Sequence, residues 1–361
     1  MAELWKLEER VTFALRELYQ RYGYAPFKMS KFEAYDLYMQ NKEFLVSDGI
    51  ITFTDTDGTL MALKPDVTLS IVKNFRKERT PIQKVCYSEN VYRISGAGHN
   101  YREIMQTGLE CLGDVGLYEI SEVICLAAAS LKTISDDFVL DISHMGIVSQ
   151  LLSELQLSEA DVTAVLGFLG EKNTDALNDL LGAKRAEKLV ALLNMTGSIS
   201  AAIPALLNLG LSNAVTALES LGRVLEQKGL AQYVRLDFSI ISNRNYYNDF
   251  VFRGYVRGIP AAVLAGGQYD RLMEKMNKQA KGIGFAVYLD QLELLDNHSS
   301  EYDVDTILVY KESDDLCEIS AIADSLSETG VLLMKQMPAG IRYRRLFQFE
   351  NGRLNKIEEH G

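Results

Sequence analysis

Cysteine and histidine are both scarce in this chain of 361 residues, which contains four of each. The cysteines include no Cys-x-x-Cys pair, and the histidines are scattered without the spacing of metal ligands. We therefore expect buried free thiols in a reducing compartment and no metal site. The cysteines are Cys86, Cys111, Cys125 and Cys317.

Long apolar runs and positive charge are also in short supply. No apolar run approaches the roughly 20 residues that a helix needs to cross a membrane, and the N-terminus lacks the uncharged core of a signal peptide. We expect a cytoplasmic protein without membrane contacts. The net charge of −12 at pH 7 opposes general attraction to phosphate backbones. We therefore expect no nucleic-acid partner.

Common nucleotide and hydrolase motifs are absent as well. The chain has no P-loop and no Gly-x-Ser-x-Gly, and the Gly-x-Gly at Gly282 is too short and too late in the chain for a dinucleotide fingerprint. What remains is an ordinary globular composition, with 47% hydrophobic and 24% charged residues. That composition and length predict two or three domains with a sizeable core.

The stretch from Val85 to Gly113 is predicted to form a β-hairpin. Two runs with strand-like alternation flank small and polar residues at 95–100. In the second run, one face carries a guanidinium, an amide and a carboxylate, and Gly108 leaves room there for a small ligand. A solvated sheet face explains the same alternation equally well. The residues of that face are Arg102, Ile104, Gln106, Gly108, Glu110 and Leu112.

A second candidate feature is the helix start after Pro65, whose fixed φ suits the first turn of a helix. Asp66 and Thr68 fall where backbone N–H groups are free. They are either caps of this helix or a carboxylate and a hydroxyl presented to the amino group of a ligand.

The periodicity changes twice along the chain. Strand patterns before residue 144 and again at 231–296 indicate one α+β core, including a helix at 117–134 and strands at 138–142, 234–241 and 261–264. The intervening residues 145–230 show Leu-rich helical patterns and are predicted to be a helical insertion that provides shape or a partner contact. After a linker, residues 303–361 predict a strand, a helix and a strand, followed by a polar tail.

Five segments in this order resemble the catalytic domain of histidyl-tRNA synthetases. They are LKPDVTLSIVK, YREIMQTGLECLG, NYYNDFVFRGY, GGQYD and GIGFAVYLDQL, and the resemblance spans residues 24–295. It implies 1–144 and 231–296 as a class II synthetase core, with an antiparallel sheet flanked by helices. It also implies a homodimer formed through the early segments.

Position by position, the resemblance implies a set of histidine-binding residues. Asp66 and Thr68 match residues around the amino group of histidine, with Asp66 in place of the usual glutamate. Gln106 and Glu110 match the amino-acid pocket. Tyr247 and Tyr269 match the imidazole site, and Arg93 matches the contact to the α-phosphate in the active enzymes. The set is Asp66, Thr68, Arg93, Gln106, Glu110, Tyr247 and Tyr269.

The same comparison reveals lost catalytic positions. Arginines expected in three motifs are replaced by Ser242, Gln268 and Gln291, and an expected aspartate is Asn245. Amino-acid activation needs fixed cations at the α-phosphate, so three losses cost on the order of 4–9 kcal/mol of transition-state stabilisation. The C-terminal unit resembles a shortened anticodon-binding domain without an evident basic face, which also disfavours tRNA.

A histidine pocket without phosphate arginines resembles the regulatory-subunit family of ATP phosphoribosyltransferase. That resemblance implies a non-catalytic subunit with no cofactor. It also implies a short-form catalytic subunit as partner, histidine as feedback effector, and a homodimer within a hetero-oligomer. Two alternatives remain open. One is a stand-alone synthetase paralogue that adenylates histidine or a related amino acid, and the other is a histidine sensor for a different partner.

Overall fold

The structure is a computed structural model that describes residues 6–45, 49–76, 80–95, 100–241, 248–295, 302–327, 330–350 and 352–360. The chain divides into two units. One contains residues 11–292, and the other contains residues 1–10 and 293–361. Each unit is described by itself.

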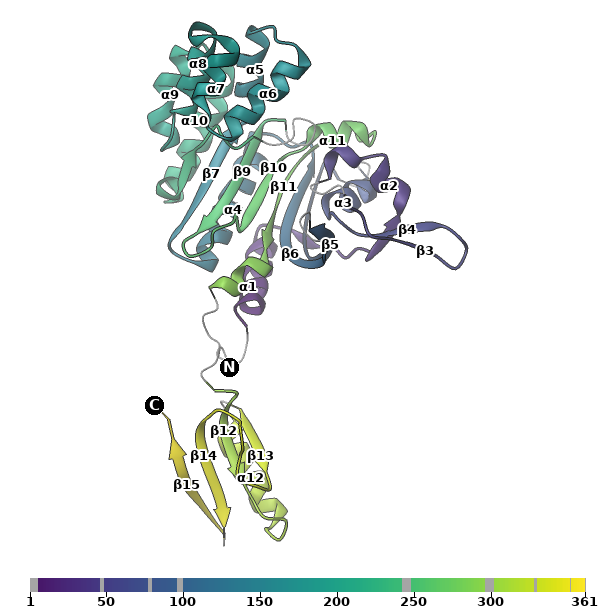
Figure 1. Cartoon of the computed structure of the whole chain (residues 1–361), viewed down its shortest axis with the longest axis vertical. Coiled ribbons are helices and arrows are strands. Elements are labelled where there is room, and N and C mark those ends of the chain that lie inside the picture. The colour runs from purple at the N-terminus through teal and green to yellow at the C-terminus, as the bar shows by residue number, and fades with distance from the viewer. Residues whose placement is uncertain are drawn as a thin grey trace. The chain divides into compact units, whose positions relative to one another are not determined.

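A mainly antiparallel sheet forms the centre of the larger unit (Figure 1). Its inner neighbours all pair antiparallel, and only the outermost strand at each edge pairs parallel. The α+β class and the antiparallel sheet flanked by helices are confirmed. In spatial order, the strands described are β1 (Ala25–Pro26), β5 (Ile82–Ser95), β6 (Asn100–Gly113), β11 (Lys281–Tyr288), β10 (Leu264–Gln268), β9 (Phe250–Val256), β7 (Phe138–His144) and β8 (Val234–Leu236).

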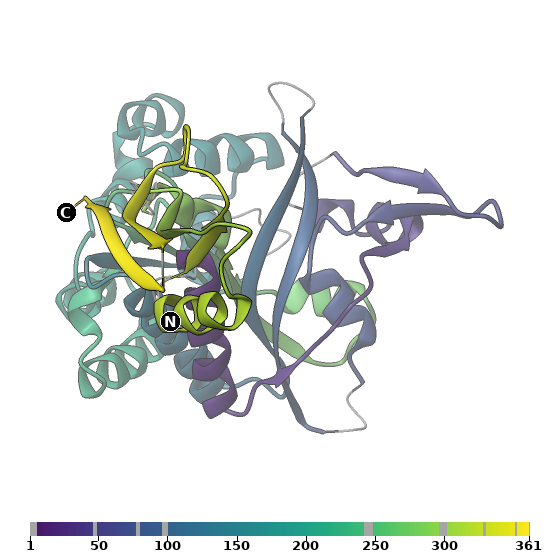
Figure 2. The same cartoon turned by 90° about the horizontal axis from the view of Figure 1, so that it is seen from below.

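The predicted hairpin is present and is the longest pairing of this sheet. Its register runs from Ile82 opposite Gly113 to Ser95 opposite Asn100, and Figure 2 shows β5 and β6 as long ribbons side by side. The middle of its tip, residues 96–99, lies outside the described residues. Strict alternation over so many residues makes the two faces of β6 unambiguous.

Helices α1 (Leu7–Arg21) and α4 (Leu117–Ile134) cover one face of the sheet. The Tyr19 hydroxyl lies 3.0 Å from Ser130 Oγ, and the Tyr19 ring meets Phe285 of β11 edge-on at 5.9 Å. The predicted helix at 117–134 is confirmed. On the opposite face, α3 (Thr68–Asn74) and α11 (Asp270–Lys275) pack over the hairpin.

A small sheet and a short helix precede α3 in the chain. The sheet consists of β2 (Phe32–Ala34), β4 (Leu60–Leu63) and β3 (Thr52–Thr54), and the helix is α2 (Tyr35–Met39).

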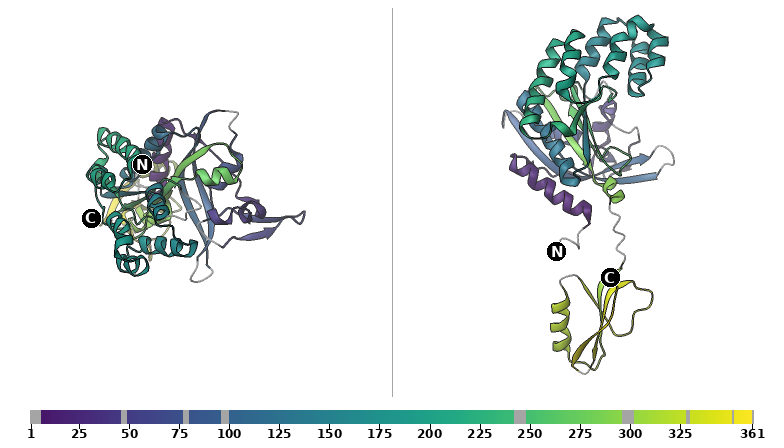
Figure 3. Two further views of the ribbon diagram at one scale, coloured as in Figure 1. Left: turned by 90° about the horizontal axis from the view of Figure 1, so that it is seen from above. Right: turned by 90° about the vertical axis from the view of Figure 1, so that its left-hand side faces the viewer.

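Residues 145–227 form the helical segment that follows β7 (Figure 3). It joins the sheet region through contacts of α10 with α4 and through a 2.8 Å ion pair between Lys172 and Asp237. Its helices are α5 (Met145–Glu154), α6 (Glu159–Gly170), α7 (Thr174–Leu181), α8 (Ala183–Leu193), α9 (Ile199–Asn208) and α10 (Ser212–Gln227).

Two strand predictions in the larger unit are wrong in their limits. The strand expected at 234–241 ends at Leu236, because Asp237 Oδ1 accepts hydrogen bonds from Ser239 N and Oγ and turns the chain. The strand expected at 261–264 instead begins at Leu264 and contains Gly266 and Gly267. A Cβ at Gly266 would lie 2.4 Å from the Gly284 carbonyl oxygen, so that glycine serves packing within the sheet rather than a turn.

The C-terminal unit contains a four-stranded sheet in the order β13–β12–β14–β15, with α12 against one face. The predicted polar tail is wrong, because residues 343–359 form the hairpin β14–β15. Phe347 and Phe349 alternate in β14 and pack on the same side as α12, and this alternation was the missed signal. The elements are β12 (Val304–Val309), α12 (Leu316–Leu326), β13 (Val331–Met334), β14 (Tyr343–Glu350) and β15 (Arg353–Glu359).

The structure bears on the predicted state of the cysteines, on metal binding and on membrane-spanning helices. Cys86, Cys111 and Cys125 are buried free thiols as predicted, whereas Cys317 is exposed. Among the residues that the structure describes, no group of three or more His, Cys, Asp or Glu side chains is placed to hold a metal ion. Within the same residues, no helix has the length and apolar character that crossing a membrane requires.

Candidate functional site

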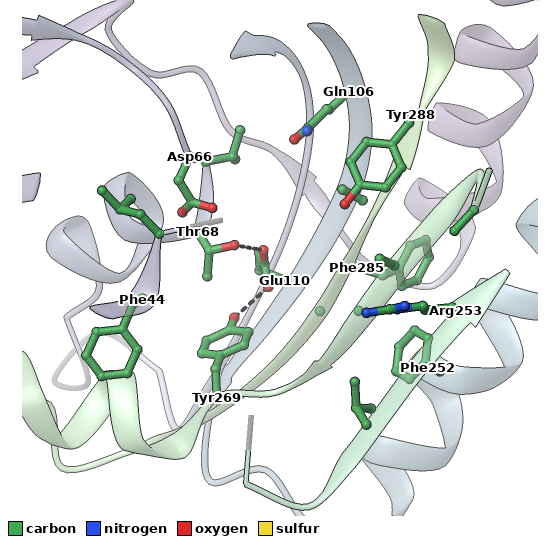
Figure 4. Close-up of a pocket in the computed structure, with 18 of the residues that line it drawn as sticks. Phe44, Asp66, Thr68, Gln106, Glu110, Phe252, Arg253, Tyr269, Phe285 and Tyr288 are labelled. Atoms are coloured by element: carbon green, nitrogen blue, oxygen red, sulfur yellow. Dashed lines mark hydrogen bonds between the residues drawn. The ribbon is translucent and has the colours of Figure 1, made fainter. Parts of the chain in front are cut away.

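A cavity of about 500 Å³ lies over the face of the sheet that carries Gln106 and Glu110 (Figure 4). Its floor is low because small residues lie side by side on neighbouring strands. Ala265 of β10 pairs with Ala286 of β11, and Gly267 of β10 pairs with Gly284 of β11. Residues directly opposite each other in an antiparallel pair share a face, so the sheet register itself creates the hollow.

Glu110 lies at the centre of the cavity and is 2% exposed. Its two oxygens accept separate hydrogen bonds, Oε1 from the Thr68 hydroxyl at 2.7 Å and Oε2 from the Tyr269 hydroxyl at 2.6 Å. Burial raises the pKa of this carboxyl from 4.5 to about 8, although both hydroxyls act to lower it. Three elements far apart in the sequence therefore fix one buried carboxyl group.

The Gly-x-Gly of β11 makes room for this arrangement. A Cβ at Gly284 would lie 1.7 Å from Glu110 Oε2, and a Cβ at Gly282 would lie 2.2 Å from the Tyr269 ring. Both distances are far below any real contact. The two glycines are thus explained by the two partners of one hydrogen bond, and not by the approach of a nucleotide.

Asp66 and Thr68 stand at the start of α3 and face the cavity. Asp66 Oδ1 accepts a hydrogen bond from Leu69 N at 2.9 Å, so this carboxylate caps the helix. It also lines the cavity, where burial raises its pKa and the Leu69 N–H and the Arg93 charge oppose that effect. The two interpretations made from the sequence are therefore compatible.

Gln106 is 3% exposed, and its Nε2 has no hydrogen-bond partner among the described residues. Buried amide donors are rarely left unpaired, and Figure 4 shows this amide beside the cavity, near Asp66 and Tyr288. The unpaired donor is therefore available to a water molecule or to a polar ligand in the cavity.

Four further polar residues line the cavity that the sequence reasoning did not single out, Glu43, Tyr87, Arg253 of β9 and Tyr288 of β11. Burial raises the pKa of the Tyr288 hydroxyl, while the charges of Arg93 and Arg253 oppose that effect. The alternation of β9 was an available signal for Arg253. The predicted Arg93 lines the cavity too, and its Nε donates to the Pro65 carbonyl oxygen at 3.1 Å.

The space over Gly108 differs from the expectation. The ring of Tyr87, directly opposite on β5, covers this glycine, and a Cβ there would lie 2.6 Å from the Tyr87 hydroxyl oxygen. Gly108 therefore accommodates a neighbouring tyrosine, and the open floor lies over Ala286 and Gly284 instead.

Of the seven residues predicted to bind histidine, six line the cavity, and Tyr247 lies outside the described residues. Among the lost catalytic positions, Ser242 is likewise outside them. Gln268 is buried, and its Oε1 accepts from Phe250 N at 3.1 Å. Gln291 Nε2 donates to Asp290 Oδ2 at 3.0 Å. Neither glutamine is among the cavity's described lining residues.

Comparison with known proteins places the chain in a family. The family model for histidyl-tRNA synthetase matches residues 2–292. A protein named ATP phosphoribosyltransferase regulatory subunit from Caldanaerobacter subterraneus subsp. tengcongensis is 30% identical over 81% of this chain and 80% of its own. The chain belongs to the ATP phosphoribosyltransferase regulatory subunits. The resemblance to histidyl-tRNA synthetases, made from the five motifs, and the resemblance to the regulatory subunits, made from the missing arginines, are both confirmed.

Solved structures agree with this family. The regulatory subunit/histidyl-tRNA synthetase from Bacillus halodurans C has a TM-score of 0.80 and 25% identity, covering 96% of this chain and 94% of that one. A chain of the ATP phosphoribosyl transferase (HisG:HisZ) complex from Thermotoga maritima has a TM-score of 0.61 and 24% identity, covering 78% of this chain and 97% of that one. The second likeness concerns the fold.

Proposed function

We propose that this protein is the non-catalytic subunit of an ATP phosphoribosyltransferase complex, needed for the first step of histidine biosynthesis, and that its cavity senses histidine. One observation carries the sensing part of the proposal. The buried Glu110, held by the Thr68 and Tyr269 hydroxyls, lies in the same cavity as the unpaired amide of Gln106.

The chemistry of this end of the cavity suits an imidazole amino acid. Glu110 and the Tyr269 hydroxyl oxygen, whose proton goes to Glu110, keep lone pairs that can each accept a hydrogen bond from an imidazole N–H. Asp66 provides a negative charge for the ammonium group, and the unpaired Gln106 Nε2 provides a donor for an acceptor atom of the ligand. The end product would then act by stabilising one quaternary state of the complex over another.

The catalytic role belongs to the partner in this proposal. The synthetase arginines are replaced by Gln268 and Gln291, which bond to Phe250 and Asp290 rather than facing the cavity. Relatives carry the name of a regulatory subunit, which supports a short-form catalytic subunit as the partner. We further propose a cytoplasmic complex in which this chain forms a homodimer.

Nucleic acid is not a partner in this proposal. In the C-terminal unit, basic side chains pair with carboxylates, as Arg342 does with Asp303 and Lys335 with Glu312, each at 2.8 Å. Paired charges leave little field to attract phosphate.

The test is inhibition of the reconstituted complex. With the short-form catalytic subunit, the wild-type chain should permit phosphoribosyl transfer and confer inhibition by histidine. Glu110→Gln should still support transfer but lose the inhibition. Glu103→Gln, which changes an exposed glutamate on the same strand, is the matched control and should behave as wild type. Equal histidine inhibition with Glu110→Gln would contradict the sensing proposal.

A working histidine-activating enzyme is the second candidate, favoured by the presence of Arg93 and Arg253 in the cavity. The two candidates differ in one reaction, the histidine-dependent exchange of pyrophosphate into ATP. We expect no exchange above background, and clear turnover would favour this second function.

A further inference from the structure

Arg253 is an unusual residue for the middle of a sheet. Its strand, β9, has neighbours on both sides, and the residue directly opposite it on β10 is Ala265. The same row continues to Ala286 on β11 and Gly108 on β6. Arg253 therefore stands at one end of the small-residue floor, and Figure 4 shows its guanidinium directed over that floor toward Glu110.

The nearest carboxylate in the register does not neutralise this guanidinium. Asp141 of β7 lies directly opposite Arg253, but its two oxygens accept hydrogen bonds from Arg235 Nε and Nη2 at 2.9 and 3.2 Å. Among the described residues, the Arg253 side chain makes no hydrogen bond or ion pair, and it is exposed to solvent at the cavity wall. Its charge is thus available to a ligand.

The two arginines of the cavity differ in this respect. Arg93 donates to the Pro65 carbonyl oxygen, and its charge acts on the neighbouring Asp66. A carboxylate placed beside Arg93 would also face Asp66, whereas the wall at Arg253 carries an uncompensated cation. An anionic group of a ligand is therefore better accommodated at Arg253.

The opposite end of the cavity is acidic. Asp66 and Glu110 lie there, and β6 is three strands away from β9, which corresponds to roughly 14 Å between strand axes. A side chain from each end shortens that span to the length of one small ligand. A cavity with acid at one end and a free guanidinium at the other suits a zwitterion, whose ammonium and carboxylate differ in sign.

We infer that Arg253 is the carboxylate anchor of this cavity and selects an amino acid, with an intact carboxylate, over the corresponding amine. The inference rests on the proposed histidine sensing and extends it to a residue outside the motif-derived set.

The test compares histidine with histamine, which keeps the imidazole and the amine but lacks the carboxylate. Binding of each to the full-length chain is measured by calorimetric titration for wild type, Arg253→Gln and Arg253→Lys. Arg257→Gln is the matched control, because Arg257 follows β9 and is paired with the exposed Asp137. Thermal unfolding of each variant checks that the fold is kept.

We expect wild type to prefer histidine over histamine, and Arg253→Gln to weaken histidine binding by on the order of 10- to 100-fold while leaving histamine binding unchanged. Arg253→Lys should fall in between, because lysine keeps the charge but not the two-pronged geometry. Arg257→Gln should match wild type.

Three results would overturn the inference, and they are distinguishable. If Arg253→Gln binds histidine as tightly as wild type does, Arg253 is not the carboxylate anchor, while the proposed histidine sensing would stand. Equal binding of histidine and histamine to wild type would show that the cavity ignores the carboxylate, while imidazole sensing would stand. Absence of histidine binding to wild type would reject the proposed sensing function, and the inference with it.

Discussion

The residues predicted to bind the amino acid and the positions of the synthetase arginines differ in how their side chains are held. At the amino-acid end, Glu110 has a hydroxyl donor on each oxygen, and Gly282 and Gly284 leave space for that arrangement. At the positions of the synthetase arginines, Gln268 holds a backbone N–H and Gln291 bonds to its neighbour. The side chains predicted to bind the amino acid thus hold one another in place, whereas the glutamines at the positions of the synthetase arginines bond to local partners.

The difference shows what each function demands. Recognition of an amino acid needs buried groups held in fixed places, and every supporting residue must remain. Activation needs cations at the α-phosphate, and these are lost without harm to the fold if the replacements find partners. The retained end is therefore where substitutions should have large effects on ligand binding.

The largest effect is expected for Gly284→Ala. The added Cβ would lie 1.7 Å from Glu110 Oε2 and 2.5 Å from the Leu109 carbonyl oxygen, so the carboxyl must move. We expect histidine affinity to fall by at least about 100-fold and stability to fall by about 1–3 kcal/mol, measured by titration and thermal unfolding.

Gly167→Ala is the matched control, because a Cβ at this position in α6 meets nothing within 4 Å. It should be neutral or slightly stabilising. Equal behaviour of the two alanine variants would contradict the packing role of Gly284.

The second prediction concerns the stability of the unliganded protein against pH. Burial raises the pKa of Glu110 from 4.5 to about 8, so the folded state holds this proton more tightly than the unfolded state. The stability contributed by Glu110 is complete below about pH 4.5 and is lost as pH rises toward 8.

The side chain in Glu110→Gln cannot ionise. The unfolding free energy of this variant minus that of wild type should therefore increase between pH 5 and 9, by on the order of a few kcal/mol. Chemical denaturation at several pH values measures the difference. A difference that stays constant with pH would show that Glu110 is not perturbed.

The third prediction is a smaller loss on Tyr269→Phe. This change removes the donor to Glu110 Oε2 but keeps the ring that packs against Gly282. Histidine affinity should fall by about 10-fold, as measured by titration. Tyr255→Phe, on β9 and not among the cavity's lining residues, should bind histidine as wild type does. Identical affinities for the two variants would contradict the role of the Tyr269 hydroxyl.

The smallest effects are expected at the arginine positions. Gln291→Ala should change histidine affinity by less than about 2-fold, because this partly buried side chain bonds to the neighbouring Asp290 and is not among the cavity's lining residues. Gln268→Ala should also leave affinity nearly unchanged, but it should cost about 1–3 kcal/mol of stability because Phe250 N loses its acceptor. A large loss of histidine affinity in either variant would contradict the distinction between the predicted amino-acid-binding residues and the positions of the synthetase arginines.

Much of this architecture could be predicted from the sequence. Alternation over long runs predicted the hairpin β5–β6, and helical periodicity predicted α4. Motif order predicted six residues that line one cavity, because residues that bind one ligand keep their spacing when the fold is kept. The hairpin β14–β15 was missed, although Asn351-Gly352 is a typical turn pair and stands between two runs of strand length.

The remaining features depend on contacts between distant segments. The position of Arg253 at the end of the cavity floor follows from the register of β9, β10 and β11, which local alternation does not specify. Gly284 is required because the carboxyl of Glu110 on β6 occupies the space of a Cβ. The residues next to Gly284 in the sequence do not indicate this contact. Such relations become visible only when the strands are paired.

A crystal structure of the chain with bound histidine tests the central claim most directly. The account predicts an imidazole beside Glu110 and Tyr269, an ammonium group at Asp66 and a carboxylate at Arg253. A cavity left empty at saturating histidine, or histidine bound elsewhere on the chain, would contradict it.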